Sequence, residues 1–371
     1  MITKRRGGGR RRGDWFSRGR TDASESRSRL KPLNEEGDGA MRGLKWLALW
    51  STVVFVFTGS ALGATTWQAN SVWPPENHHS KALIEFAQKV EEKTGKELVL
   101  KVSTGGALGF KGPELLKVVR DGLVHVSDML MSGVAGDEPI FGITTLPFLV
   151  KDFAEAKILN EVARPYYDKA AEKWNQKILY TVPWPAAGLF SKKPIKSIED
   201  MKGLKTRTYD KNGALVIQAL GATPHPLPFS EVYTALATGL IDSVLTSTPT
   251  AVDAKFWEVL KYFQRINITQ GVDMVNVNLT AFNKLDRKLQ EALVEVGREM
   301  EEKWWKEVER IDAEMEKKCN DNGIESVPPS EEFMKSLSEV ARQIHQDWLA
   351  SAPAEAKEVY HKFLEKVGRK Q

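Results

Sequence analysis

Residues 286–320 read DRKLQEALVEVGREMEEKWWKEVERIDAEMEKKCN, and this stretch decides the fold of the chain. Its apolar residues recur at spacings of three and four: Leu289, Leu293, Val296, Met300, Trp304, Val308, Ile311, Met315 and Cys319. This spacing predicts one amphipathic helix of more than about 45 Å, at ~1.5 Å per residue. A coiled-coil stripe is the alternative, but the run lasts only about five heptads and its flanking charges are irregular. A helix this long can lie across two small lobes and join them.

Short β-rich runs alternate with amphipathic helices between residue 65 and this long helix, a pattern typical of α/β proteins. Strands are expected at 98–102, 123–129, 178–182, 204–209, 243–246 and 274–279. Helices are expected at 80–93, 330–348 and 353–367. Because each strand is short, the sheets must be covered by helices.

The length and composition describe an ordinary globular protein. The 371 residues suffice for about two domains of roughly 150 residues. The 42% hydrophobic and 27% charged residues argue against a disordered chain and against a membrane protein with many spans. One cysteine, Cys319, excludes an internal disulfide and a thiolate zinc cluster.

The positive net charge of +4 comes from the N-terminus. Residues 1–40 hold 11 Lys and Arg against 6 Asp and Glu, and the chain from Thr65 onward has a net charge of −3. The body of the protein therefore offers no general electrostatic basis for binding nucleic acid.

Residues 41–64 have the three parts of a secretory signal peptide. Arg42 and Lys45 precede an uncharged run, WLALWSTVVFVF at 46–57, and small residues follow it. Cleavage is expected near residue 63 or 64. A permanent membrane anchor is the alternative, but the run is shorter than the ~20 residues that cross a bilayer. Export predicts a periplasmic protein. Residues 1–40 are interpreted as a disordered extension or as a start codon assigned upstream of Met41.

Recognisable catalytic motifs are missing from the sequence. No two of its six histidines have the spacing of a metalloprotease helix, and it has no P-loop, dinucleotide fingerprint or Gly-x-Ser-x-Gly elbow. We therefore predict no catalytic residue, no cofactor and no metal ion. The pair His78 and His79 is interpreted as solvated residues at a helix N-terminus, because adjacent helical residues point about 100° apart.

Residues 195–209 combine a short helical turn, Gly203 and a strand in which Lys205, Arg207 and Tyr209 share one face. Arg207 lies near the carboxyl end of this strand, where α/β folds place ligands. On its own, an arginine on a strand is more often a surface charge.

Several ordered blocks resemble one family. They are DMKGLKTRTYD at 200–210, LGATPHPLPFSEVYTALATGLIDSV at 220–244, KFWEVLKYF at 255–263, STGGAL at 103–108 and Leu146-Pro147-Phe148. Together they resemble the extracytoplasmic solute-binding proteins of tripartite ATP-independent periplasmic (TRAP) transporters, the DctP family. The similarity runs from Trp67 to about Ser326.

The resemblance implies a two-lobe α/β fold that closes on its ligand like a Venus flytrap, with the helix at 286–320 packing across both lobes. Residues 65–190 would form lobe I, completed by parts of 280–371, and residues 191–279 would form lobe II. Helices at 330–371 would complete the fold. The implied function is a receptor that captures an organic acid and delivers it to a membrane permease.

The resemblance also implies that Arg207 binds the substrate carboxylate. A guanidinium offers two parallel N–H donors to a carboxylate, which a lysine cannot copy. A second family arginine falls near Ala187 here, and a family asparagine is replaced by Thr246. The site has thus lost a charge and gained the aromatic Trp184. We expect a monocarboxylate, with an apolar or aromatic tail, ahead of a short dicarboxylate.

Further binding residues are expected around Arg207. Trp184 lies between two prolines that fix its backbone. The other candidates are Thr246, Ser247, Asn70, Trp73, Phe229 and Phe148. Core packing is the alternative for the aromatic residues, and turn hydrogen bonding for the hydroxyl residues.

Two other functions stay open at this point. The chain could be a sensory protein that reports an acid to a receptor kinase. It could also be an exported hydrolase whose catalytic residues match none of the motifs considered above. A monomer is expected, although the apolar stripe Val359, Phe363 and Val367 could instead join two copies.

Overall fold

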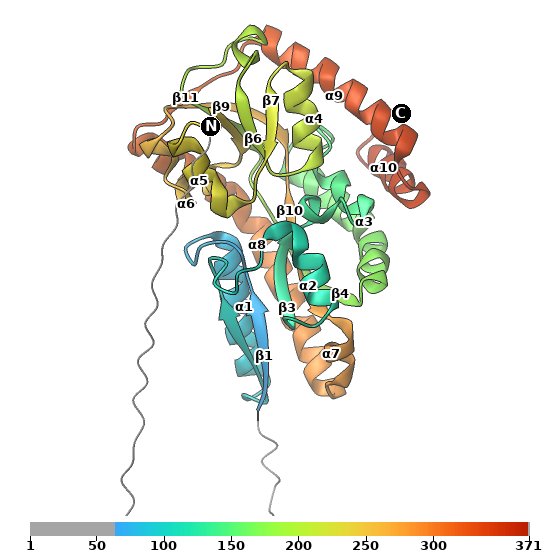
Figure 1. Ribbon diagram of the computed structural model, residues 1–371. Helices are drawn as coiled ribbons and strands as arrows, with labels where there is room; N and C mark the ends of the chain where they lie inside the picture. Colours follow the sequence, from blue (N-terminus) through green and yellow to red (C-terminus); the bar gives the residue numbers. More distant parts are fainter. Residues whose placement is uncertain (1–63, 370–371) are drawn as a thin grey trace, which may run out of the picture. The chain divides into compact units, whose positions relative to one another are not determined.

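Two mixed β-sheets carry the fold, and the computed structural model describes residues 64–369 (Figure 1). The extension expected at 1–40 and the signal peptide expected at 41–64 therefore lie outside the described residues, apart from Ala64. The first sheet has the order β2-β1-β3-β10-β4. Its strands are β1 (Thr65–Asn70), β2 (Leu98–Ser103), β3 (Val126–Leu130), β4 (Gln176–Pro183) and β10 (Val272–Asn278).

The second sheet has the order β11-β9-β5-β8-β6-β7. Its strands are β5 (Ala187–Ser191), β6 (Lys205–Thr208), β7 (Thr223–Pro226), β8 (Ser243–Thr246), β9 (Tyr262–Thr269) and β11 (Glu325–Val327). Strands β6, β7 and β8 run parallel, whereas β5 is antiparallel to both β8 and β9. The strands expected from the sequence are thus all present, with ends shifted by a few residues.

The chain crosses between the sheets after β4, after β9 and again through α8, and the first two crossings are adjacent. The backbone N–H of Trp184 in the first crossing donates to the carbonyl of Gly271 in the second, at 2.9 Å. The positions of these crossings differ from the expected division of the chain, which assigned residues 65–190 to lobe I and 191–279 to lobe II. Residues 187–190 lie in the second sheet and 272–278 in the first, because β10 inserts between β3 and β4.

Helices cover both sheets, and we call each sheet with its helices a lobe. The helices are α1 (His78–Lys93), α2 (Leu115–Arg120), α3 (Phe153–Lys173), α4 (Lys211–Ala219), α5 (Phe229–Ala237), α6 (Thr248–Asp253), α7 (Leu279–Lys284), α8 (Arg287–Asp321), α9 (Glu331–Ser351) and α10 (Ala354–Lys366). Figure 1 shows α1, β1 and β3 of the first lobe below β6, β7 and α4 of the second.

Helix α8 confirms the long helix predicted from the apolar spacing. It begins after Asp286, whose carboxylate accepts from the backbone N–H of Leu289 at 2.9 Å. It contacts α1 and β4 in the first lobe and α6 and β11 in the second. Gly297 lets the helix approach β4 closely, since a Cβ there would lie 2.6 Å from the carbonyl oxygen of Leu179. The helix therefore ties the two lobes together.

Three apolar clusters form the interior of the described part of the chain. One joins α1, α8 and the first sheet, and a second joins α5, α6 and the second sheet around Phe190 and Cys319. The third and largest packs α3, α9 and α10 around Tyr167 and Phe363. None of the helices within residues 64–369 has the length and hydropathy needed to cross a membrane.

Candidate ligand-binding site

A small pocket lies at the two adjacent crossings between the lobes, and we call it the head pocket. It leaves about 30 Å³ of free space. Its lining comes from both lobes and both crossings: Trp73, Leu130, Trp184, Pro185, Ala187, Arg207, Tyr209, Thr246, Ser247, Thr250 and Gly271. Six of these side chains are aromatic, proline or aliphatic, and the others are an arginine, three hydroxyl residues and a glycine. The head pocket therefore suits a small molecule with one anionic group.

A larger outer pocket adjoins the head pocket and leaves about 370 Å³. The two share Trp73, Leu130, Arg207 and Tyr209. The glycine-rich segment 105–113 of the first lobe and the segment 226–230 of the second form its other walls. A ligand held at Arg207 can therefore extend from one pocket into the other.

Arg207 is a buried cation that faces both pockets. Its side chain is only 4% exposed, and its Nε donates to the carbonyl of Leu227 at 3.0 Å. Among the described residues, no carboxylate lies within ion-pair distance of its guanidinium, and no hydrogen bond involves its two terminal nitrogens. Burial lowers the pKa of Arg207 to about 10, so the group stays charged at neutral pH. A buried charge without a counterion is costly, which makes this position attractive for an anion.

Two tryptophans form an aromatic wall on the other side of the head pocket. The rings of Trp73 and Trp184 meet edge to face, with centroids 4.8 Å apart. One carboxylate orients both, because Trp73 Nε1 donates to Asp273 Oδ2 at 2.8 Å and Trp184 Nε1 donates to Asp273 Oδ1 at 2.6 Å. Phe229 extends the wall into the outer pocket, with its centroid 5.6 Å from that of Trp73.

Three hydroxyl groups border the head pocket where β8 leads into α6. They belong to Thr246, Ser247 and Thr250, and all three residues are buried. The hydroxyls of Ser247 and Thr250 lie 3.3 Å apart. Each hydroxyl can donate to or accept from a ligand, so this side of the pocket can recognise polar groups other than the carboxylate.

Six of the eight residues predicted to bind ligand line these pockets: Arg207, Trp184, Thr246, Ser247 and Trp73 in the head pocket, and Phe229 in the outer one. Asn70 and Phe148 line neither. The Asn70 amide turns into the first sheet and donates to Ser127 Oγ at 3.2 Å. Phe148 has a left-handed backbone, φ 54°, and packs against the large apolar cluster.

The structure adds residues that sequence reasoning missed. Tyr209 lies beside Arg207, with the guanidinium carbon 5.8 Å from its ring centroid, and its hydroxyl lies 2.7 Å from Thr269 Oγ1. The alternation of side chains along the strand predicts that Arg207 and Tyr209 share one face, so it could have identified Tyr209 as a site residue. Leu130 and Gly271, which line the head pocket, and Asp273, which orients its tryptophans, had no such signal, because residues distant in the chain bring them together.

The prediction for His78 and His79 was wrong, since both side chains are buried. The start of α1 lies under the end of β4, where His78 Nε2 is 3.3 Å from the carbonyl oxygen of Pro183. His79 packs against Trp184, with ring centroids 4.2 Å apart and ring planes tilted by 34°. Burial lowers the pKa of His78 to about 4 and lowers that of His79 well below its usual value. The wall of the head pocket thus rests on two neutral histidines.

Polar contacts near the pockets join segments of the two lobes. Lys111, in the glycine-rich segment, places Nζ 2.7 Å from Glu231 Oε1 on α5. Asn77, which caps α1, donates to Asp253 at the end of α6. The lobes are therefore latched together in this structure.

Comparison with known proteins identifies the family. Residues 69–351 match the family model of DctP, the bacterial extracellular solute-binding proteins of family 7. The 2,3-diketo-L-gulonate-binding periplasmic protein YiaO of Escherichia coli K12 is 31% identical over 261 residues, which cover 68% of this chain and 77% of that protein.

Solved structures show the same fold. DctP7, a Bordetella pertussis extracytoplasmic solute receptor binding pyroglutamic acid, is 28% identical with a TM-score of 0.79, covering 81% of this chain and 99% of its own. A marine metagenome TRAP solute-binding protein specific for pyroglutamate is 27% identical with a TM-score of 0.79 and the same coverage. These relatives are solute receptors, which favours the receptor interpretation over the sensory protein and the hydrolase. The chain belongs to the DctP family of bacterial extracellular solute-binding proteins, the organic-acid receptors of TRAP transporters.

Proposed function

We propose that this receptor captures a compact monocarboxylic acid, with Arg207 as the anchor of its carboxylate. One observation carries the proposal: the guanidinium of Arg207 is buried at the junction of the two pockets, and no carboxylate among residues 64–369 lies within ion-pair distance of it. A carboxylate can accept two parallel hydrogen bonds from its free terminal nitrogens. Among the described residues, no second arginine or lysine lines the head pocket, so a second carboxylate would lack a partner there.

The pocket walls select the rest of the ligand. Trp73, Trp184 and Pro185 suit the face of a ring or a short apolar chain, and the hydroxyls of Thr246 and Ser247 suit its polar edge. Pyroglutamate, bound by two relatives of 27% and 28% identity, combines one carboxylate with a small lactam ring. It is therefore the first ligand to test, ahead of the sugar acids and dicarboxylates.

Capture is proposed to occur in the periplasm, by closure of the lobes over the acid. The contacts Lys111–Glu231 and Asn77–Asp253 hold the closed form, and their loss would release the ligand to a membrane permease. Such release requires the free-energy difference between the open and closed forms to be small. We propose a monomer, because Val359 and Phe363 of α10 are buried within their own chain.

Isothermal titration of the purified protein tests the proposal with three groups of acids: pyroglutamate and other compact monocarboxylates, sugar acids, and short dicarboxylates. Binding of a monocarboxylate is expected, with Arg207→Lys weakening it at least tenfold because the lysine cannot form the two-pronged contact. Arg265→Lys is the matched control, since Arg265 lies in the same sheet but pairs with Asp312 outside the pockets.

Two results would contradict the proposal. A dicarboxylate that binds more tightly than every monocarboxylate would overturn the ligand class. Equal affinity in wild type and Arg207→Lys, with the control unchanged, would remove Arg207 as the anchor while leaving the receptor function intact.

A further inference from the structure

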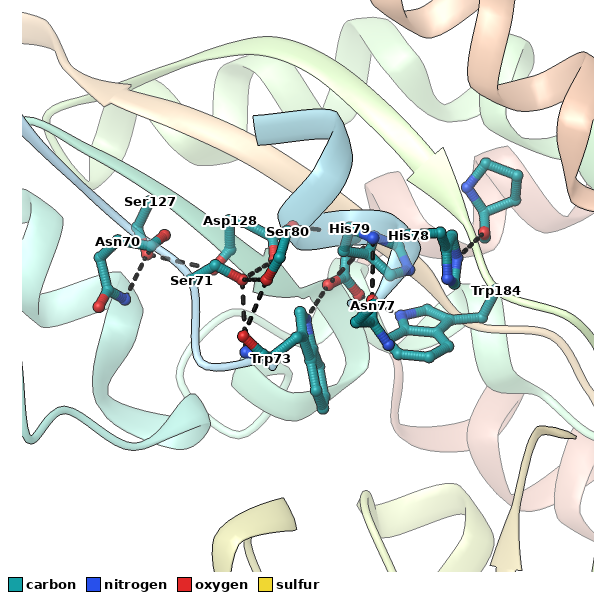
Figure 2. Close-up of polar contacts among 12 residues, drawn as sticks. Asn70, Ser71, Trp73, Asn77, His78, His79, Ser80, Ser127, Asp128 and Trp184 are labelled. Carbon is teal, nitrogen blue, oxygen red and sulfur yellow. Dashed lines mark hydrogen bonds and ion pairs between the residues drawn. The ribbon is translucent and has the colours of Figure 1, made fainter. Parts of the chain in front are cut away.

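A buried cluster of three ionisable side chains lies behind the tryptophan wall of the head pocket. His79 comes from α1, Asp128 from β3 and Asp273 from β10, and all three side chains have no exposed surface. His79 Nδ1 lies 3.8 Å from Asp128 Oδ1 and 3.6 Å from Asp273 Oδ2. Figure 2 shows His79 and Asp128 in this cluster, between Ser71 and Trp184. Three separate elements thus bring one nitrogen and two oxygens together.

Several polar atoms of this cluster lack hydrogen-bond partners in the described part of the chain. They include both ring nitrogens of His79 and Oδ1 of Asp128. Distances of 3.6 to 3.8 Å from His79 Nδ1 are too long for hydrogen bonds. Buried polar groups are nearly always paired, because an unpaired one loses its hydration without compensation. These atoms therefore point to a missing ligand.

We propose that His79, Asp128 and Asp273 form a binding site for one divalent transition-metal ion, with Zn²⁺ as the best fit. One ligand atom from each residue can be chosen so that all three lie within 4.8 Å of one another. Ligand atoms on a tetrahedral Zn²⁺ are about 3.4 Å apart, given Zn–N and Zn–O bonds of about 2.0–2.2 Å. The two distances from His79 Nδ1, 3.8 and 3.6 Å, exceed that value by only a few tenths of an ångström.

The donor set favours a transition metal over magnesium or calcium. Imidazole nitrogen together with carboxylate oxygen suits Zn²⁺, whereas Mg²⁺ and Ca²⁺ take six or more oxygen ligands. Three protein ligands leave one position of a tetrahedral ion for a water molecule. The two carboxylates would also balance the two positive charges of the ion.

Outer contacts already orient the two carboxylates, as is common around metal ions. Ser71 Oγ donates to Asp128 Oδ2 at 3.0 Å. Trp73 and Trp184 donate to the two oxygens of Asp273, and Oδ2 keeps a lone pair for the metal. The ion would thus fix Asp273 and, through it, the two indoles that line the head pocket.

The competing explanation is a proton shared between Asp128 and Asp273 with no metal. A shared proton would relieve the repulsion between the carboxylates, but it leaves both nitrogens of His79 without partners. A cation satisfies Nδ1 and both carboxylates at once and leaves only Nε2 of His79 without a partner. This inference concerns a site behind the pocket and does not rest on the proposed ligand.

Metal analysis of tag-free protein tests the inference. The protein is stripped with a chelator, equilibrated with Zn²⁺ or Co²⁺, and freed of unbound metal. We expect one equivalent per chain, a higher unfolding midpoint with Zn²⁺ than in chelator, and the intense visible bands of tetrahedral Co²⁺. Tryptophan fluorescence should change on metal binding, because Asp273 contacts both indoles of the wall.

Variants locate the ion. Asp128→Asn and His79→Gln should abolish the bound equivalent, and Ser71→Ala should weaken metal affinity about 10- to 100-fold. His345→Gln is the control, because His345 lies on α9 and contacts Tyr360 and Pro147 instead. The inference is overturned if wild-type protein binds no Zn²⁺ or Co²⁺, a result that needs no variant to fold. It is also overturned if both ligand variants keep the wild-type affinity.

Discussion

Asn77 donates a hydrogen bond of 2.6 Å from its Nδ2 to Oδ2 of Asp253, and this contact joins the start of α1 in the first lobe to the end of α6 in the second. The Asn77 side chain also caps α1, because its Oδ1 accepts from the backbone N–H of His79. Asn77 therefore both caps α1 and forms a hydrogen bond between the two lobes. The proposed closure would therefore involve the residue that begins α1, the helix whose histidines support the tryptophan wall.

Asp253 should make lobe closure depend on pH. Burial raises its pKa to about 6, while its hydrogen bond with Asn77 and the charges of Lys318 and Lys81 act the other way and Glu76 adds to the rise. In the open form the carboxyl is solvated and keeps its usual, lower pKa. The closed form therefore binds the proton more tightly, and closure weakens as the pH rises from about 4 to about 6.

The variant Asp253→Asn removes this dependence, since the amide oxygen still accepts from Asn77 but carries no charge. At pH 7 we expect the variant to bind the acid more tightly than wild type, by up to about 3 kcal/mol for a pKa change of this size. The ratio of the two dissociation constants, measured by titration between pH 4 and 7, cancels the titration of the ligand itself. A ratio that stays constant over this range would contradict the prediction.

The ion pair between Lys111 and Glu231 should slow ligand release. Both side chains are about half exposed, so Lys111→Ala should change the unfolding midpoint little. Release of the bound acid, followed by stopped-flow tryptophan fluorescence, should become several-fold faster because one latch across the outer pocket is lost. Raising the salt concentration should reduce the difference, since screening weakens the pair in wild type.

Lys117→Ala is the matched control for this latch. Lys117 pairs with Asp137 at 2.8 Å, and both residues belong to segments of the first lobe. Its loss should leave the release rate unchanged. Equal acceleration in both variants would mean that charge, and not the latch, controls release.

Gly297 should be intolerant of any side chain. A Cβ at this position would lie 2.6 Å from the carbonyl oxygen of Leu179 and 3.2 Å from its carbon, so Gly297→Ala forces α8 away from β4. Overpacking of this kind costs about 1–3 kcal/mol. Urea unfolding should show a lower midpoint for Gly297→Ala than for Gly136→Ala, where nothing lies within 4 Å of the added Cβ. Equal midpoints would show that the helix shifts without cost.

Cys319 should be unreactive until the protein unfolds. The thiol is fully buried near the end of α8, and burial raises its pKa to about 12, so very little thiolate exists at neutral pH. A thiol reagent should label none of the folded protein at pH 8 and one cysteine per chain in denaturant. Rapid labelling under native conditions would indicate local opening of the contact between α8 and α6.

The sequence predicts the elements better than their assembly. The apolar spacing located the helix at 287–321 to within one residue at each end, because a repeat of three and four depends only on neighbouring turns of the same helix. The alternation around Arg207 likewise placed it on a strand near Tyr209. The expected strand at 274–279 was found at 272–278, but its place in the first sheet was not predictable from its own residues.

Local patterns also fail where burial depends on distant elements. His78 and His79 have no sequence signal that distinguishes a solvated helix start from one covered by β4 and Trp184. Asp273 lies in a strand without a recognisable motif, yet it holds both tryptophans of the pocket wall. Trp73 and Asp273 are 200 residues apart in the chain, a separation over which no periodicity carries information.

The sequence by itself determined the α/β class, the long helix, the resemblance to the DctP family and the choice of Arg207. These follow from short-range periodicity and from ordered blocks whose residues are contiguous. The tertiary structure alone decided which residues share a pocket, where the chain changes sheets, and that His79, Asp128 and Asp273 meet. Those features come from the packing of two sheets through paired crossings at Trp184 and Gly271, and packing is fixed by long-range burial that no single segment encodes.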